Sequence, residues 1–186
     1  MRNLLLLLLA AVFGIVTTLV SRAASAEDEA TLERRVKAAF VYKFAGYVEW
    51  PDSAFTSPAA PITIGVLGDD AMVGELTQVV AGRTIDSHPL TVRRLRQGES
   101  LTGLHVLFVG NSERARLAEA RPVRSQPLMV ISEHDGALDQ GSVINFLIVG
   151  GRVRFEVGLD NAERRGLKLS SRLLTVAHFV RMAQSQ

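Results

Sequence analysis

The side chains of this sequence that could do acid–base or metal chemistry are four histidines and one short acidic turn. The histidines are scattered along the chain, at His88, His105, His134 and His178. Glu133–Gly136 has the residue types of a metal site, but neighbouring residues on a turn cannot all converge on one ion. We therefore interpret this stretch as a solvated turn. His105 begins an apolar strand, where we expect a histidine satisfied by hydrogen bonds at the end of a sheet and not a ligand.

Signatures of the common enzyme classes are missing. The sequence has no Gly-x-Ser-x-Gly elbow, no Walker loop, no Gly-x-Gly-x-x-Gly and no His-Glu-x-x-His. It has no cysteine either, which excludes a disulfide, a thiol nucleophile and a thiolate metal site. We expect no catalytic residue, no cofactor and no bound metal, and therefore a protein that is not an enzyme.

Polar residues follow three of the expected strands, at Asp69, Asn111 and Glu133. Open α/β sheets bind ligands at the carboxyl ends of their parallel strands, so these residues are candidates for a ligand pocket. Ordinary helix capping explains the same residue types. If the ligand interpretation holds, the protein is a periplasmic receptor for a small molecule that feeds a membrane signalling protein.

The most unusual local feature is an aromatic cluster on a helix expected from Glu29 to Trp50. Five aromatic residues fall within it: Phe40, Tyr42, Phe44, Tyr47 and Trp50. Four share the apolar arc of the helix, which indicates core packing. Tyr42 lies off that arc, as do Arg172 and Phe179 on the expected last helix. Binding faces favour aromatic and Arg anchors, so these three are the expected partner-binding residues.

Lys43 falls near the centre of the same apolar arc. It is either a lysine whose stem packs on the core while its amine reaches water, or a buried amine paired with a carboxylate. Glu156, on the polar face of an expected hairpin, is the candidate partner.

The N-terminus predicts export. Arg2 precedes an uncharged run from Leu4 to Val20, and Ala24 and Ala26 form a signal-peptidase site. We expect residues 1–26 to be a signal peptide cleaved after Ala26 (an uncleaved anchor is the alternative) and residues 27–186 to be one domain. Cleavage removes two of the 21 basic residues and none of the 19 acidic ones, so the charge falls from +2 to zero. That balance argues against a nucleic-acid partner.

Along the rest of the chain, strands alternate with short helices, which predicts an α/β fold with a mostly parallel sheet. Gly150-Gly151 predicts an antiparallel hairpin in which Ile144, Phe146 and Ile148 face Val157, Phe155 and Val153. The chain is expected to end in a helix from Ser171 to Ala183, capped by Ser170. The expected strands are 62–67, 90–95, 105–109, 128–131, 143–149 and 152–157, and the other expected helices are 71–81, 112–120 and 160–165.

These residues together resemble the YfiR/HmsC-like family of periplasmic proteins over about Val36 to Arg181. The matching stretches are Lys37–Pro51, Ile64–Gly68, His105–Val109, Gly141–Phe146, Arg152–Val157 and Gly166–Leu174.

The resemblance implies a single three-layer α/β/α sandwich without catalytic residues. It also implies a repressor that binds the periplasmic sensor domain of an inner-membrane diguanylate cyclase or related receptor, and so limits cyclic di-GMP and biofilm formation. Further implied partners are an outer-membrane lipoprotein that sequesters the repressor and a second copy in a homodimer. Relatives often carry a cysteine where this chain has Leu104, so redox control through disulfides is not expected here.

Overall fold

The structure is a computed structural model that describes residues 27–114 and 126–182. The expected signal segment, 1–26, and most of the helix expected over 112–120 lie outside these residues. Residues 27–34 are helical, and the described residues from Arg35 onward form a second unit, which holds the sheet. Within the described part of the chain, no helix has the length and apolar character needed to cross a membrane.

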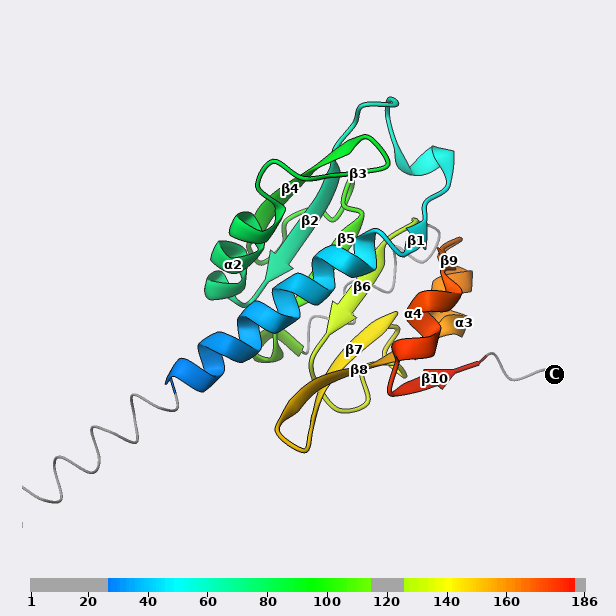
Figure 1. Cartoon of the computed structure of the whole chain (residues 1–186). Helices are drawn as coiled ribbons and strands as arrows, with labels where there is room; N and C mark the ends of the chain where they lie inside the picture. Colours follow the sequence, from blue (N-terminus) through cyan, green and yellow to red (C-terminus); the bar gives the residue numbers. More distant parts are fainter. Residues whose placement is uncertain (1–26, 115–125, 183–186) are drawn as a thin grey trace, which may run out of the picture. The chain divides into compact units, whose positions relative to one another are not determined.

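A mixed sheet of eight described strands is the framework of that unit (Figure 1), which confirms the predicted α/β fold class. The strand order is β10-β8-β7-β6-β5-β2-β4-β3, and every neighbouring pair is parallel except β7–β8 and β3–β4. Two further strands, β1 and β9, pair antiparallel in a small separate sheet. The bounds are β1 Val48–Glu49, β2 Ile62–Leu67, β3 Thr84–Ile85, β4 His88–Leu95, β5 Val106–Val109, β6 Met129–Ser132, β7 Ile144–Val149, β8 Arg152–Gly158, β9 Lys168–Leu169 and β10 Phe179–Arg181.

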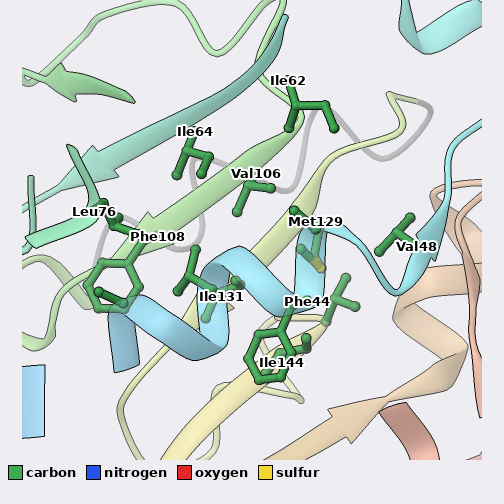
Figure 2. Close-up of a cluster of buried hydrophobic side chains, with 14 of the residues drawn as sticks. Phe44, Val48, Ile62, Ile64, Leu76, Val106, Phe108, Met129, Ile131 and Ile144 are labelled. Carbon is green, nitrogen blue, oxygen red and sulfur yellow. The ribbon is translucent and has the colours of Figure 1, made fainter. Parts of the chain in front are cut away.

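Alternate residues of the central strands feed two hydrophobic clusters, one on each face of the sheet. On β5, Val106 and Phe108 belong to the larger cluster, whereas Leu107 and Val109 belong to the smaller one. Figure 2 shows the larger cluster, in which side chains of β2, β5, β6 and β7 meet Phe44 of the first helix. Strands that are apolar on both faces are typical of a parallel sheet covered on both sides, as the sequence predicts.

Four α-helices and two 3-10 segments accompany the strands in the described residues, and the second 3-10 segment covers residues 111–114. The first helix spans residues 27–45, followed by η1 Asp52–Ala54, α2 Asp70–Val80, α3 Leu159–Arg164 and α4 Ser171–Val176. The first helix (from residue 35) and α2 both contribute to the larger cluster, so they cover the same face of the sheet (Figure 1). Leu104, in the loop before β5, packs in the smaller cluster, and a Cβ at Gly65 would lie 2.8 Å from the side chains of both Leu104 and Leu95.

The first helix ends at Ala45, five residues before its predicted end at Trp50. After Ala45 the chain turns, and β1 pairs Val48 with Leu169 of β9. Trp50 lies beyond β1, where its indole donates back to the carbonyl of Ala45. The aromatic spacing therefore spans a helix and an extended segment, and helical periodicity alone did not distinguish the two.

The hairpin of β7 and β8 forms in the predicted register. Ile144 faces Val157, Phe146 faces Phe155, and Ile148 faces Val153. Gly150 and Gly151 both have positive φ, which two-residue turns of this kind require. The alternation of side chains and the turn sequence agreed with each other, which is why this pairing could be predicted from sequence.

The predicted C-terminal helix from Ser171 to Ala183 is wrong beyond its first turns. Ser170 caps it as predicted, accepting a hydrogen bond from the backbone of Arg172, but α4 stops at Val176. His178 then donates its backbone N–H to Phe155, and β10 pairs in parallel with β8. The free edge of β8 offers backbone hydrogen bonds to a β-branched and aromatic segment, and this tertiary pairing overrides the helical spacing.

Arg181 fastens β10 to the body of the protein. Its guanidinium donates to Asp139, Asp160 and the carbonyl of Leu138 at 2.7–3.2 Å. Burial would raise the pKa of Asp160, but hydrogen bonds from Arg181 and Arg164 outweigh it and hold that pKa below its ordinary value. This contribution to stability is present above about pH 4 and is lost as the pH falls through the lowered pKa.

His105 is hydrogen-bonded at both nitrogens, as expected for a histidine at the end of a sheet. Its Nδ1 accepts from the backbone of Thr63 at 3.1 Å, so Nε2 carries the proton and donates to the carbonyl of Ala54 at 3.0 Å. The ring also stacks on Phe55. Burial is the main reason that the pKa of His105 is lowered, and the neighbouring His88 lowers it further against an opposing hydrogen bond to Ala54.

We predict that His105 makes the protein less stable as the pH falls below about 6.5. The unfolded chain takes up the proton near that pH, whereas the folded protein binds it only at lower pH, so protonation favours unfolding. The loss cannot exceed ~1.4 kcal/mol per pH unit for one group. Urea unfolding between pH 7 and pH 5 should show a steeper loss for the wild type than for His105→Gln, which keeps a donor and an acceptor. Parallel pH profiles of the two proteins would contradict the prediction.

Candidate functional site

An apolar groove lies between the first helix, β8 and α4. It has a volume of about 320 Å³ and is lined by Phe40, Lys43, Phe44, Tyr47, Val153, Arg154, Phe155, Leu173 and Val176. Its base is aromatic, because the rings of Phe44 and Phe155 pack edge to face with centroids 4.7 Å apart. Phe40 stacks on Phe44 at 5.6 Å and stays half-buried.

Cations stand at the border of this groove. Lys43 and Arg154 line it and are exposed, and exposed Arg172 precedes the lining residue Leu173. Among the described residues, neither Lys43 nor Arg154 has an ion-pair partner. An apolar base with unpaired cations beside it suits a partner segment with apolar side chains flanked by acids.

Large apolar side chains are also exposed along β10 and its approach. Val176 is 62% exposed, Phe179 is 53% exposed and Met182 is 65% exposed. β10 is the last strand of the sheet, so one side of its backbone has no neighbouring strand among the described residues. Val176 belongs to both this edge and the groove. We call the two together the groove–β10 surface.

The three predicted anchors lie in different environments. Phe179 is exposed as expected, but on strand β10 and not on a helix. Arg172 is exposed in the first turn of α4. Tyr42 is half-buried, and the guanidinium of Arg83 covers its ring at 4.9 Å. Tyr42 therefore packs on a second element, which leaves Phe179 and Arg172 as the accessible anchors.

The proposed pair of Lys43 with Glu156 is not formed. Lys43 is exposed, and the carboxylate of Glu156 accepts a hydrogen bond from Asn145 at 2.9 Å. The apolar arc of the first helix is centred near Val41, with Ala38 and Ala45 also buried, so Lys43 projects from the opposite side. Counting Tyr47 and Trp50 as helical displaced the predicted arc toward Lys43.

The buried lysine of this helix is Lys37, which pairs with Glu133. Its ammonium lies 2.7 Å from one carboxylate oxygen, and the two side chains are only 10% and 15% exposed. The second oxygen of Glu133 accepts from the backbone N–H of Asn111 at 3.0 Å. A helical wheel centred on Val41 places Lys37 on the buried arc, so the signal was present in the sequence.

Two of the three predicted ligand-loop residues come together in a polar pocket. Asn111 and Glu133 line it with Arg114, His134, Asp135 and Gln140, in a volume of about 350 Å³. The pocket lies where β5 and β6 end, as the rule for parallel strands predicts. Asp69 instead caps α2, accepting from the backbone N–H of Met72 at 2.9 Å. Gly110 allows the loops after β2 and β5 to approach, because a side chain there would meet the carbonyl of Gly68 at 3.1 Å.

His134 is buried beside this pocket. It is 8% exposed, and neither ring nitrogen has a hydrogen-bond partner among the described residues. Its backbone N–H donates to the side chain of Asn145 at 3.1 Å. Within the described ranges, no cluster of His, Asp and Glu side chains is arranged to hold a metal ion.

A buried network of polar side chains, Ser132, Ser142 and Asn145, lies next to the pocket residues Glu133 and His134. Ser132, Ser142 and Asn145 are fully buried, and Ser132 donates to Ser142 at 2.7 Å. Asn145 accepts from the backbone of His134 and donates to Glu156 on β8. The turn that carries His134 is therefore connected by hydrogen bonds to the strand beside β10.

We predict that the pair of Lys37 with Glu133 is strongly coupled. Replacing Glu133 by Gln removes the carboxylate charge that lies 2.7 Å from the buried ammonium, which should lower the free energy of unfolding by ~3 kcal/mol. The double variant Lys37→Met with Glu133→Gln should regain much of this loss. Denaturant unfolding of the wild type, both single variants and the double variant gives the coupling energy.

The exposed pair of Lys168 with Glu49 is the matched control. Its atoms lie 3.2 Å apart, but the side chains are 76% and 73% exposed. A cycle with Lys168→Met and Glu49→Gln should give a coupling below about 1 kcal/mol. Equal coupling energies for the two pairs would show that burial does not strengthen the pair of Lys37 with Glu133.

Comparison with known proteins agrees with the resemblance seen in the sequence. The family model described as YfiR/HmsC-like matches residues 34–178, which include every described strand of the sheet except β10. No curated protein gives a significant match to the chain. Because the family match covers well over half of the sequence, the chain belongs to the YfiR/HmsC-like family.

Proposed function

We propose that this protein is a periplasmic repressor that binds the sensor domain of an inner-membrane diguanylate cyclase and so limits cyclic di-GMP and biofilm formation. Membership of a regulatory family supports this proposal over a catalytic role. Export through residues 1–26 would bring the protein to the compartment where such sensor domains lie.

The groove–β10 surface carries the proposal, because it combines the features of a binding face. Exposed Phe179 and Val176 can anchor a partner, and the aromatic base of the groove can receive an apolar side chain. Lys43, Arg154 and Arg172 would favour a partner segment that bears acidic residues. The open side of β10 provides backbone groups that an extended segment could pair with.

The same surface gives a simple route to derepression. An outer-membrane lipoprotein that occupied the groove–β10 surface would exclude the cyclase, because two partners cannot bind one face at once. A homodimer formed through β10 would have the same effect. In this proposal, the cyclase is released whenever a competitor covers the surface.

We predict that the double variant Val176→Ser, Phe179→Ser no longer represses the cyclase. Loss of an interface aromatic costs on the order of 2 kcal/mol of binding free energy, which is a roughly 30-fold weaker complex. Both side chains are exposed, so folding should change by little more than ~0.5 kcal/mol. Cyclic di-GMP should rise to the level of a strain that lacks the protein, while the periplasmic amount of the variant stays normal.

Leu32→Ser is the matched control, since Leu32 is 63% exposed and does not belong to the groove–β10 surface. It should repress like the wild type. Unchanged cyclic di-GMP in the deletion strain would refute the repressor function itself. Full repression by the double variant, in a strain where the deletion does raise cyclic di-GMP, would place the interface on another face.

A further inference from the structure

The polar pocket at the ends of β5 and β6 has the properties of a site for a small ligand. It is not part of the groove–β10 surface, so the proposed partner binding does not explain it. Its volume of about 350 Å³ is near the lower limit for ligand pockets. Every described residue that lines it has a polar or charged side chain. An apolar ligand would leave these groups without hydrogen bonds, so the chemistry of the pocket requires a polar one.

The charged side chains that line the pocket differ in whether they have partners within the protein. Both carboxylate oxygens of Glu133 have partners: one accepts from the ammonium of Lys37, and the other accepts from the backbone N–H of Asn111. Arg114 and Asp135 are exposed and have no ion-pair partner among the described residues. As far as the described residues go, the pocket therefore presents one unpaired cation, Arg114, and one unpaired anion, Asp135, to an occupant.

His134 is the second, independent observation. More than nine-tenths of this residue is buried, and both of its ring nitrogens lack partners in the described structure. Burying a polar ring without hydrogen bonds is unfavourable, and natural folds seldom retain such a group without a use for it. The backbone hydrogen bond to Asn145 holds the residue in place beside the pocket.

We propose that this pocket binds a small hydroxycarboxylate, such as a sugar acid. Arg114 takes the carboxylate in the two-point geometry that guanidinium groups favour. Asp135 accepts a hydroxyl of the ligand, and His134 supplies the buried hydrogen-bonding contact. A simple cation is disfavoured by Arg114, and an oxyanion without donor groups leaves Asp135 unsatisfied. This site goes beyond the proposed function, and its test requires no cyclase.

Calorimetric titration of the purified protein with three six-carbon probes tests the ligand class. D-Gluconate carries both a carboxylate and hydroxyls, sorbitol carries hydroxyls alone, and hexanoate carries a carboxylate alone. We expect saturable binding of gluconate, with sorbitol and hexanoate weaker by roughly 10-fold or more, because each lacks one set of charge-assisted hydrogen bonds. No saturable heat with gluconate up to on the order of 10 mM, or equal binding of all three probes, would overturn the proposal.

Two variants test the residues. His134→Phe keeps a buried ring but removes both unpartnered nitrogens, so it should raise the melting temperature of the free protein and weaken gluconate binding. A lower melting temperature with unchanged binding would show that the nitrogens serve the fold alone, against the proposal. Arg114→Gln is at an exposed position and should weaken gluconate binding roughly 10-fold. Arg93→Gln, an exposed arginine on β4, is its matched control and should bind like the wild type.

Discussion

The buried ion pair between Lys37 and Glu133 is the contact on which both candidate surfaces depend. It joins the first helix to the turn after β6 across 96 positions of sequence. Through Asn111, the same carboxylate also holds the loop after β5. One side of this contact is the helix that lines the groove, and the other is the wall of the polar pocket. Separating two buried charges leaves each without its partner and costs several kcal/mol. The pair therefore fixes the position of the helix more strictly than apolar contacts alone.

A second constraint connects the pocket to the edge of the sheet. Asn145 hydrogen-bonds the backbone of His134 and the carboxylate of Glu156, and Glu156 faces Phe179 across the pair of β8 with β10. Fully buried polar groups require complete hydrogen bonding, so neither end of this chain of contacts can move without a cost at Asn145. The network supplies a physical connection between a ligand site and a partner surface. Energetic coupling through this network requires two alternative arrangements of its hydrogen bonds, each favoured by one of the two sites.

The sequence predicted those parts of the fold that short-range patterns determine. Strand β2, the cap of α4 and the register of β7 with β8 followed from alternation, turn residues and capping residues. The failures came where distant segments decide the outcome. The segment from Phe179 to Arg181 becomes a strand because β8 offers a free edge. The residues around Phe179 alone do not indicate that this edge is available. For the site, the strand-end rule placed Asn111 and Glu133 at one edge of the sheet. The buried Lys37 was missed, because the misplaced end of the first helix directed attention to Lys43.

The groove–β10 surface and the polar pocket differ in how much stability they cost the folded protein. The groove–β10 surface exposes Phe179 and Val176, which costs little in a folded monomer because scattered apolar side chains on a surface are ordinary. His134 is different, because an unsatisfied imidazole inside the protein opposes folding at every moment that it has no partner. A phenylalanine would fill the same space without that penalty. The presence of a histidine at this position is therefore easier to explain by an occupant of the pocket than by the packing of the fold.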